Sequence, residues 1–322
     1  MDLLYADDKT INELPIEWDQ LMNAIRKAVS LIHLGDYSQP LKPYLRYNDP
    51  KNRIIAMPAF LGGEINMAGI KWIASFPDNI RKGLQRAHCV IVLNDSDTGV
   101  PLAVFNSAKI SALRTASVSG TFIEEFLKKR GKHLNLGIIG WGPIGKCHYQ
   151  LINEKFSDYI NNIYIYDIRE IKIAEYNPYH YINTVVLNSW QELYENSDIV
   201  ITCTVSDFPY IDLKPKDKTL LLNISLRDYK PSIYNWVKDS IVVDDWDEVC
   251  RENTDIENMN KIYGLSKEST INMYDILFKS KINDLYPKPI MFNPMGLATF
   301  DIAISSFYYH KLTDVNCGKK MD

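Results

Sequence analysis

Residues 134–145 read Leu-Asn-Leu-Gly-Ile-Ile-Gly-Trp-Gly-Pro-Ile-Gly, and this stretch decides the fold of more than half of the chain. A short apolar segment runs directly into glycines at positions 140, 142 and 145. A second apolar segment, Ile-Tyr-Ile-Tyr-Asp at 163–167, ends in an acid. Glycines at this spacing between a strand and a helix, with an acid after the next strand, are typical of a dinucleotide-binding βαβ unit. The stretch therefore predicts a Rossmann-type domain that begins in mid-chain.

Each glycine of this motif, and the acid after the second strand, has a physical role. Gly140 permits a tight turn, Gly142 lets backbone N–H groups approach a pyrophosphate, and Gly145 lets the helix pack closely on the strand. The helix N-terminus adds the positive end of a dipole. Asp167 is placed to accept hydrogen bonds from both ribose hydroxyls, and its charge repels a 2′-phosphate. We therefore expect NAD rather than NADP as cofactor, with Arg169 weakening that preference slightly.

After residue 134, apolar strands alternate with stretches of helical length. Strands are expected at residues 136–139, 163–166, 199–204, 220–224 and 241–243. Strands separated by helix-length crossovers predict a doubly wound parallel sheet in an α/β fold. The segment 290–296 shows no evident strand partner there. We expect it, with the Ala-rich helix that follows to residue 310, to cross back to the first region.

The first region has a different texture. An amphipathic helix is expected over residues 16–32, closed by Gly35, and a second helix over 107–129. Short strands punctuated by Gly and Pro are expected at 53–57, 70–74, 90–93 and 102–105. These features predict a largely antiparallel α+β unit. We expect a discontinuous substrate and dimerisation domain of residues 1–115 and 293–322, and a nucleotide-binding domain of residues 116–292.

Composition limits the classes of function. The chain has 322 residues, 46% hydrophobic and 24% charged, with net charge −4, which gives no reason to expect nucleic acid or an anionic membrane as partner. No apolar run approaches the ~20 residues that span a bilayer. The five cysteines form no CxxC pair and the six histidines are dispersed, so we expect reduced thiols, no metal site and a cytoplasmic location.

Residues at the ends of two expected strands offer hydroxyl and backbone groups to a ligand, because ligands of doubly wound sheets lie beyond the carboxyl ends of the strands. They are Thr202, Cys203, Thr204, Asn223, Ile224 and Ser225. Ordinary strand-end caps are the alternative interpretation. Cys203 is interpreted as a packed residue rather than a nucleophile, because no histidine lies beside it in the sequence. Asp228, on the loop after the second strand, could be a general acid/base for an amine or imine, or a solvated loop acid.

The first region also carries cations beside apolar strands: Lys42, Arg46, Arg53, Lys71 and Arg114. A buried lysine is costly unless it is paired, and a substrate carboxylate is one way to pair Lys71. Arg114 interrupts a helix of small and apolar residues, and its planar fork suits a carboxylate. Each cation alone could be a surface residue. Together they predict an anionic substrate with more than one carboxylate.

The chain resembles the ornithine cyclodeaminase/mu-crystallin family nearly from end to end. The carrying motifs are Gln39-Pro-Leu-Lys42, Ala56-Met-Pro58, Gly69-Ile-Lys-Trp72, Thr98-Gly-Val-Pro101, Leu113-Arg-Thr-Ala116 and Val242-Val-Asp-Asp245. The resemblance implies an NAD-dependent oxidoreductase that forms a homodimer. It implies that Lys71 and Asp228 are catalytic, and that Lys42, Met57 and Arg114 bind the substrate. Cofactor contacts then fall on Thr115, Pro143, Ile144 and Ile168 besides the residues named above.

Within the family the chain is most similar to a branch that makes 2,3-diaminopropionate for siderophores, through Gln39–Arg46, Arg53–Pro58, Ile201–Val205 and Asn293-Pro-Met-Gly296. The resemblance implies oxidative cleavage of a secondary amine with three carboxylates, which gives Arg46 and Arg53 a task. The chain is shorter around 171–181, which puts its second Rossmann helix in doubt. A cyclodeaminase, an amino-acid or imine oxidoreductase, and a non-catalytic NAD(P)H-binding protein remain as alternatives.

Overall fold

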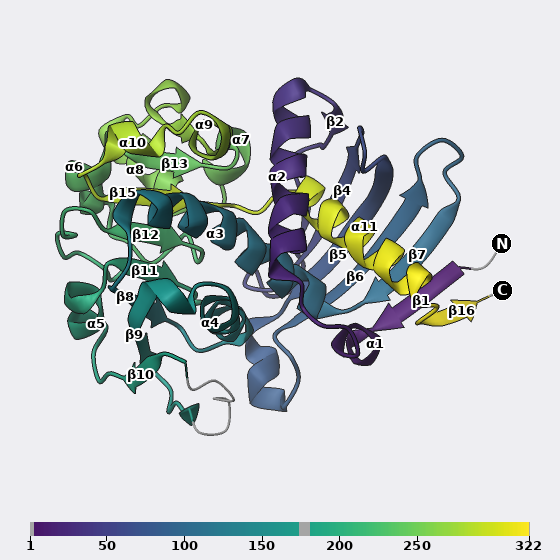
Figure 1. Ribbon diagram of the computed structural model, residues 1–322, viewed down its shortest axis with the longest axis horizontal. Helices are drawn as coiled ribbons and strands as arrows, with labels where there is room; N and C mark the ends of the chain where they lie inside the picture. The colour runs from purple at the N-terminus through teal and green to yellow at the C-terminus, as the bar shows by residue number, and fades with distance from the viewer. Residues whose placement is uncertain (1–2, 174–180, 322) are drawn as a thin grey trace. The chain divides into compact units, whose positions relative to one another are not determined.

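The computed structural model describes residues 3–173 and 181–321. The chain divides into two compact units. Unit 1 comprises Met1–Ser117 and Gly296–Asp322, and unit 2 comprises Val118–Met295 (Figure 1). The long helix α3 (Ala108–Arg130) contains the point of division.

Unit 1 is built on one twisted sheet. Its strands are β1 (Leu3–Asp7), β2 (Tyr37–Ser38), β3 (Tyr44–Leu45), β4 (Arg53–Leu61), β5 (Met67–Ser75), β6 (Ala87–Asp95), β7 (Pro101–Asn106) and β16 (Lys319–Met321). Their order is β16-β1-β7-β6-β5-β4-β2, with β3 also paired to β4. Every pairing is antiparallel except that of β1 with β7. The largely antiparallel α+β unit is therefore confirmed, and its four predicted strands are longer than expected.

Helices cover this sheet. They are α1 (Asp8–Asn12), α2 (Trp18–Leu34) and α11 (Ala298–Asp314), with a 3₁₀ turn at Pro77–Lys82. The amphipathic pattern correctly predicted α2, which ends at Gly35 with a φ of 77°, a conformation that favours glycine. Helix α11 packs against β4, β5 and α2, where it lies across the sheet in Figure 1. Its residues 298–306 are all buried, the charged Asp301 among them, and its exposed residues lie in the last two turns.

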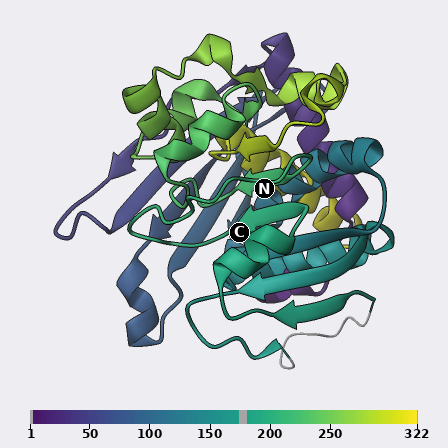
Figure 2. The same cartoon turned by 90° about the vertical axis from the view of Figure 1, so that its left-hand side faces the viewer.

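Unit 2 contains a parallel sheet of eight strands (Figures 1 and 2). The strands are β8 (Leu134–Ile139), β9 (Ile160–Tyr166), β10 (Asn183–Val186), β11 (Ile199–Thr202), β12 (Leu220–Asn223), β13 (Ile241–Val243), β14 (Ile271–Asn272) and β15 (Ile290–Asn293). Their order is β10-β9-β8-β11-β12-β15-β13-β14. The order reverses between β8 and β11, which is where a doubly wound sheet binds its ligand. The predicted Rossmann-type α/β fold is confirmed.

One expectation for this sheet is wrong. The segment 290–296 was expected to lack a partner strand here, yet β15 pairs in parallel with both β12 and β13. All four of its residues are buried, and the Phe292 ring stacks on that of Phe122 with centroids 4.4 Å apart. A short apolar run buried on both faces carries no periodicity that distinguishes a central strand from a crossing segment. Only the helix after it belongs to unit 1.

The helices of unit 2 are α4 (Pro143–Lys155), α5 (Trp190–Asn196), α6 (Tyr234–Val237), α7 (Trp246–Val249), α8 (Asp255–Tyr263), α9 (Met273–Phe278) and α10 (Ile282–Leu285). The alternating directions of side chains along β8 show that two of these helices, α4 and α5, lie on different faces of the sheet. A Cβ on Gly137 would meet the Leu193 side chain of α5, whereas a Cβ on Gly145 of α4 would lie 3.3 Å from Ile138. Adjacent strand residues face opposite sides, so α4 and α5 cover opposite faces of β8.

The predicted shortening around 171–181 falls mostly on residues 174–180, which lie outside the described part of the chain. Within residues 3–173 and 181–321, no helix combines the length and apolarity needed to cross a membrane.

Candidate functional site

The glycine motif forms the turn that the sequence predicts. Gly140 has a φ of 104°, and a Cβ there would lie 2.7 Å from the Cys203 carbonyl carbon. A Cβ on Gly145 would lie 2.0 Å from the Gly140 oxygen, so only glycine lets α4 start this close to β8. Gly142, by contrast, has no heavy atom within 4 Å of where its Cβ would be. The backbone there is open for a ligand, which fits a pyrophosphate at the start of α4.

The start of α4 also has the composition of a phosphate-binding turn. Gly142 is the N-cap residue and has extended backbone. Because it is a glycine, it has no side chain that could cap the helix. Pro143 occupies the first helical position, where its missing N–H costs nothing. The Ile144 carbonyl accepts a 2.8 Å hydrogen bond from His148 Nδ1. Because no side chain caps this end of α4, the N–H groups of its first turn can donate to a bound ligand.

Asp167 ends β9 beside this turn. Its Oδ2 accepts a 2.7 Å hydrogen bond from the Trp141 amide, and its Oδ1 accepts bonds from the Arg169 amide and Nε. Burial raises the pKa of Asp167, but the hydrogen bonds from Arg169 and Trp141 outweigh burial, and the net pKa lies below its usual value. The carboxylate is therefore ionised, as ribose binding requires. Ile168 next to it is 90% exposed.

The two predicted strand tips lie side by side because β11 and β12 are neighbours with Thr202 opposite Asn223. Thr202 Oγ1 donates to Asn223 Oδ1 at 3.3 Å, and the Ser225 amide donates to the Thr202 carbonyl at 3.0 Å. The Ile224 amide donates to the Leu222 carbonyl at 3.1 Å. The strands end at Thr202 and Asn223, slightly earlier than predicted, so Cys203, Thr204 and Ser225 belong to loops.

Asp228 is fully buried, so its interpretation as a solvated loop acid is wrong. The Ser225 hydroxyl donates to its Oδ2 at 2.5 Å, and the Thr204 hydroxyl donates to its Oδ1. Burial raises the pKa of Asp228 above its usual value, and the hydrogen bonds from Ser225, Thr204 and Thr202 offset part of that effect. A raised pKa makes this carboxylate a stronger base than an ordinary aspartate, which suits a group that accepts and returns a proton.

A second buried acid lies behind Asp228. Asp255, the first residue of α8, accepts hydrogen bonds from Asn223 Nδ2 at 3.0 Å and from the Tyr229 amide at 3.2 Å. Asn223 Nδ2 also donates to Asn293 Oδ1 at 2.8 Å, which joins β12 to β15. Burial raises the pKa of Asp255 to about 7, and the charge of Asp228 adds to the rise.

Cys203 has a neighbour that sequence proximity did not indicate. Its Sγ lies 4.0 Å from His148 Nδ1, on α4. His148 is fully buried and its Nε2 lies 2.8 Å from the Ser119 hydroxyl, while burial lowers its pKa to about 4. Burial also raises the pKa of the Cys203 thiol well above its usual value. A neutral imidazole beside a neutral thiol is a packed pair and not an activated nucleophile, in agreement with the sequence interpretation.

In unit 1, three of the five predicted cations are buried together. Asp301 of α11 accepts hydrogen bonds from Lys71 Nζ at 2.5 Å and from Arg114 Nε at 3.0 Å. Lys42 Nζ donates to the Gly296 carbonyl at 2.8 Å, and a Cβ on Gly296 would lie 2.3 Å from Arg114 Nη1. Lys42, Lys71 and Arg114 are 3%, 1% and 8% exposed, which excludes a surface role for them. We call Lys42, Lys71, Arg114 and Asp301 the cation cluster.

The remaining predicted residues of unit 1 lie around β4 and α3. Met57, 3% exposed, is the residue of β4 that pairs with Lys71 of β5. Arg46 and Arg53 place their guanidinium carbons 4.8 and 5.9 Å from the centre of the Tyr44 ring, so both stack on one aromatic side chain. Thr115 donates its hydroxyl to the Ser111 carbonyl at 2.8 Å within α3.

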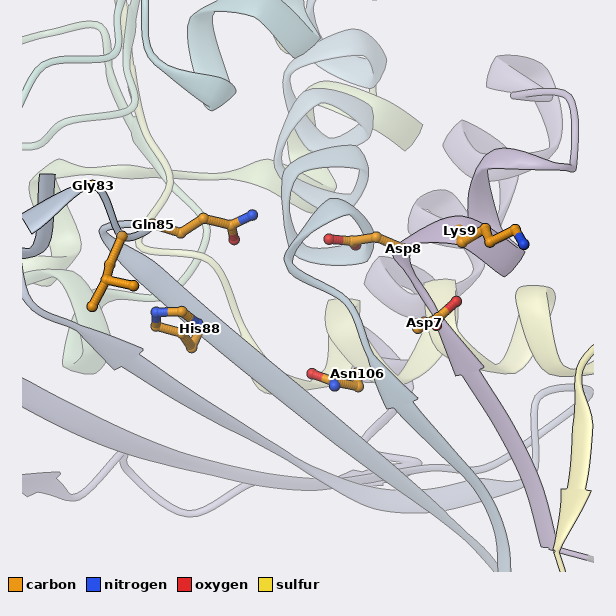
Figure 3. Close-up of a pocket in the computed structure, with 8 residues that line it drawn as sticks. Asp7, Asp8, Lys9, Gly83, Gln85, His88 and Asn106 are labelled. Atoms are coloured by element: carbon orange, nitrogen blue, oxygen red, sulfur yellow. The ribbon is translucent and has the colours of Figure 1, made fainter.

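A hollow of about 450 Å³ elsewhere in unit 1 is lined by Asp7, Asp8, Lys9, Gly83, Leu84, Gln85, His88 and Asn106 (Figure 3). No predicted site residue lines it. Its acids already serve the local structure, because Asp7 accepts from the Thr10 amide at the start of α1 and Asp8 accepts from Ser107. We therefore do not assign the function to this hollow.

Sequence reasoning missed Asp301, Asp255 and Tyr44. Asp301 had a usable signal, because it is a lone acid in the apolar run Ala-Thr-Phe-Asp-Ile-Ala-Ile at 298–304, just as Arg114 is a lone base in Ala-Leu-Arg-Thr-Ala at 112–116. Asp255 had none, since Thr-Asp at 254–255 reads as an ordinary helix start. Tyr44 lies between Lys42 and Arg46 and could have been found by its position alone.

Comparison with known proteins identifies the family. The model of the ornithine cyclodeaminase/mu-crystallin family matches residues 7–214. The chain is 35% identical to N-((2S)-2-amino-2-carboxyethyl)-L-glutamate dehydrogenase of Staphylococcus aureus, over 100% of this chain and 98% of that protein. It is 28% identical to the alanine dehydrogenase of Archaeoglobus fulgidus, again over 100% and 98%.

A solved structure of Δ1-pyrroline-2-carboxylate reductase from Thermococcus litoralis, in complex with NADH and L-proline, superposes with a TM-score of 0.85 at 22% identity. That alignment covers 99% of this chain and 100% of the other, and it shows a shared fold. The glycine turn, the buried acids and the cation cluster thus lie in a fold and a sequence that match one family over most of their length. The chain belongs to the ornithine cyclodeaminase/mu-crystallin family.

Proposed function

We propose that the chain is an NAD-dependent oxidoreductase that cleaves N-(2-amino-2-carboxyethyl)-L-glutamate to 2,3-diaminopropionate and 2-oxoglutarate, for siderophore or related secondary-metabolite biosynthesis. The 35% identity to the Staphylococcus aureus dehydrogenase over the whole chain carries this proposal. We also infer a cytoplasmic homodimer, since a related archaeal alanine dehydrogenase, 26% identical with a TM-score of 0.83, is described as a dimer with bound NAD.

The nucleotide is held by unit 2 in this proposal. The open backbone at Gly142 and the start of α4 would receive the pyrophosphate, and the ionised Asp167 would receive the ribose hydroxyls. The loop residues Thr202, Cys203, Thr204, Asn223, Ile224 and Ser225 would border the redox ring. NAD, when bound, would accept a hydride from the glutamate-derived carbon of the substrate.

The side chains of the protein then manage carboxylates and protons. Lys42, Lys71 and Arg114 would bind substrate carboxylates, and Arg46 and Arg53 would bind the additional one of this tricarboxylic substrate. Asp228 would take a proton from the secondary ammonium group of the substrate and pass it to solvent, so that the neutral amine can lose a hydride and become an iminium. It would next accept a proton from the attacking water and return it to the departing amine, releasing 2-oxoglutarate and 2,3-diaminopropionate.

The test follows the two products separately. Purified protein, NAD and N-(2-amino-2-carboxyethyl)-L-glutamate should give NADH and 2-oxoglutarate in equal amounts. Ornithine and alanine, as rival substrates, should give neither. Net NADH from alanine alone would favour an amino-acid dehydrogenase, and proline from ornithine without net NADH would favour a cyclodeaminase.

The role of Asp228 is tested in the same assay. Asp228→Asn keeps the size of the side chain and removes the base, so turnover should fall by roughly 10²–10⁴-fold while NADH binding is preserved. Ser197→Ala, a change elsewhere in unit 2, serves as the matched control. Unchanged turnover in Asp228→Asn contradicts the mechanism. Tight NADH binding by the wild type with no turnover of any substrate would identify a non-catalytic binding protein.

A further inference from the structure

The cation cluster contains one acid that has no assigned task in the proposed reaction. We propose that Asp301 is a positioning residue that holds Lys71 and Arg114 as a preassembled clamp for a substrate carboxylate. The inference rests on the proposed function for the substrate class only, because the clamp itself follows from contacts within unit 1.

The geometry of Arg114 gives the first argument. Asp301 Oδ1 accepts a hydrogen bond from Arg114 Nε at 3.0 Å. Among the described residues, Nη1 and Nη2 of Arg114 donate no hydrogen bond, although the side chain is only 10% exposed. A carboxylate binds two N–H groups of a guanidinium side by side. Because Asp301 occupies Nε, a ligand carboxylate can pair only with Nη1 and Nη2. Asp301 therefore determines which edge of the guanidinium faces the ligand.

Lys71 gives the second argument. Its Nζ lies 2.5 Å from Asp301 Oδ2 and 3.5 Å from the Ser111 hydroxyl, and the side chain is 2% exposed. An ammonium group has three N–H donors, so one strong hydrogen bond leaves donors for a ligand. Holding a flexible lysine in one rotamer before the ligand arrives removes part of the entropic cost of binding.

The balance of charge gives the third argument. The groups that face Lys71 are Asp301 from α11, Arg114 and Ser111 from α3, and Cys89 from β6. Burial lowers the pKa of Lys71, Asp301 raises it, and Arg114 lowers it. Arg114 and Lys71 together keep the pKa of Asp301 below its usual value despite burial. Two cations and one carboxylate leave one positive charge, which a substrate carboxylate neutralises.

Asp301 also lies where the chain can hold the whole cluster together. In the same first turn of α11, the Thr299 amide donates to Gln39 Oε1 at 3.0 Å, three residues before Lys42. The Gly296 carbonyl, just before the helix, accepts from Lys42. Residues 296–301 therefore contact the segments that carry Lys42, Lys71 and Arg114. Asp301 is the acidic residue in this stretch, and its charge is opposite to that of the three cations.

The experiment measures carboxylate binding and its pH dependence with the full-length protein. 2-Oxoglutarate is titrated calorimetrically into the NADH complex of the wild type and of Asp301→Asn. We expect roughly 10–100-fold weaker binding in the variant, with the loss of binding at alkaline pH moved to lower pH, because Lys71 loses the acid that maintains its charge. NADH affinity, a property of unit 2, should not change.

Ser305→Ala is the matched control, since it removes a buried hydroxyl of α11 that has no hydrogen-bond partner among the described residues, and its 2-oxoglutarate affinity should stay within about twofold. Should Asp301→Asn yield no folded protein, Asp301→Glu replaces it, because the extra methylene displaces both cations and should again weaken binding. Wild-type affinity and an unmoved pH profile in the tested variant overturn the proposal, as does a wild type that binds no 2-oxoglutarate. Absent turnover with intact binding would overturn only the proposed function.

Discussion

Asp301 in unit 1 and Asp228 in unit 2 are both fully buried acids, and the protein stabilises them in opposite ways. Asp301 contacts an ammonium and a guanidinium, which keep its pKa below the usual value. Asp228 accepts hydrogen bonds from the hydroxyls of Thr204 and Ser225, and burial raises its pKa. Asp255 behaves like Asp228, with amide donors in place of hydroxyls.

The two environments suit two chemical roles, the holding of cations and the exchange of protons. An acid paired with cations stays ionised, so it can hold those cations in fixed positions but cannot exchange a proton near neutral pH. Asp228 has neutral hydrogen-bond donors that offset only part of the effect of its burial, so its pKa is raised and it binds a proton more readily than Asp301 does. Unit 1 therefore has the electrostatics of a binding site for anions, and unit 2 has those of a proton-transfer site.

After Asp228→Asn, the largest expected effect comes from removing a cation of unit 1. Lys71→Met keeps the apolar stem of the side chain and leaves Asp301 paired with Arg114 alone. We expect kcat/KM to fall by roughly 10²–10³-fold, because an oriented charge near the reacting carboxylate is lost. Steady-state assays should show this loss while NADH titration stays normal. A value within tenfold of the wild type would mean that Lys71 serves the fold rather than the substrate.

A smaller effect is expected from the backbone of unit 2, where two glycines should respond differently. In Gly145→Ala the new Cβ would lie 2.0 Å from the Gly140 oxygen, so roughly 1–3 kcal/mol of stability should be lost. In Gly142→Ala the Cβ meets no protein atom, so the melting temperature should not change. NADH affinity of Gly142→Ala should nevertheless fall at least about tenfold, since the methyl group occupies the approach of the pyrophosphate.

Thermal unfolding of the two glycine variants without ligand, followed by NADH titration, checks this pair. Equal loss of stability in both would show that Gly142 is needed for the fold and is not an opening for a ligand.

The smallest effect concerns Asp255 and appears only as a pH dependence. Its folded-state pKa of about 7 lies above the usual 3.8, so the folded protein retains a proton that the unfolded chain releases. The contribution of Asp255 to the stability of the wild type is then largest at acidic pH and decreases as pH rises from about 4 to about 7. Asp255→Asn has no ionisable group at this position and so lacks this pH-dependent contribution to stability. The difference in unfolding free energy between variant and wild type should therefore grow in favour of the variant over that range, and then level off.

Urea unfolding at several pH values measures this difference, with Asp212→Asn, an exposed acid of the same unit, as control. A constant difference between pH 4 and 8 would show that Asp255 does not ionise in this range.

The features that the sequence predicted have local signals. The glycine turn at 140–145, helix α2 with its terminal Gly35, and strands β8, β9, β11, β12 and β13 of unit 2 each show a pattern within a few residues. Strands β10 and β14 were not predicted. What escaped prediction depends on residues far apart in the chain. Lys71 and Asp301 are separated by 230 positions, and His148 and Cys203 by 55. The place of β15 between β12 and β13 likewise depends on pairing that four apolar residues cannot encode alone.

The location of α11 has a consequence for biosynthesis. Lys71 and Arg114 emerge from the ribosome long before Asp301, and the sheet of unit 2 lacks its inner strand β15 until residue 293 has been made. Domains generally fold from the N-terminus as they are synthesised, but neither unit of this protein can finish early. A chain released before residue 290 would leave two cations without their acid and a gap in the parallel sheet, so residues 290–314 complete both units together.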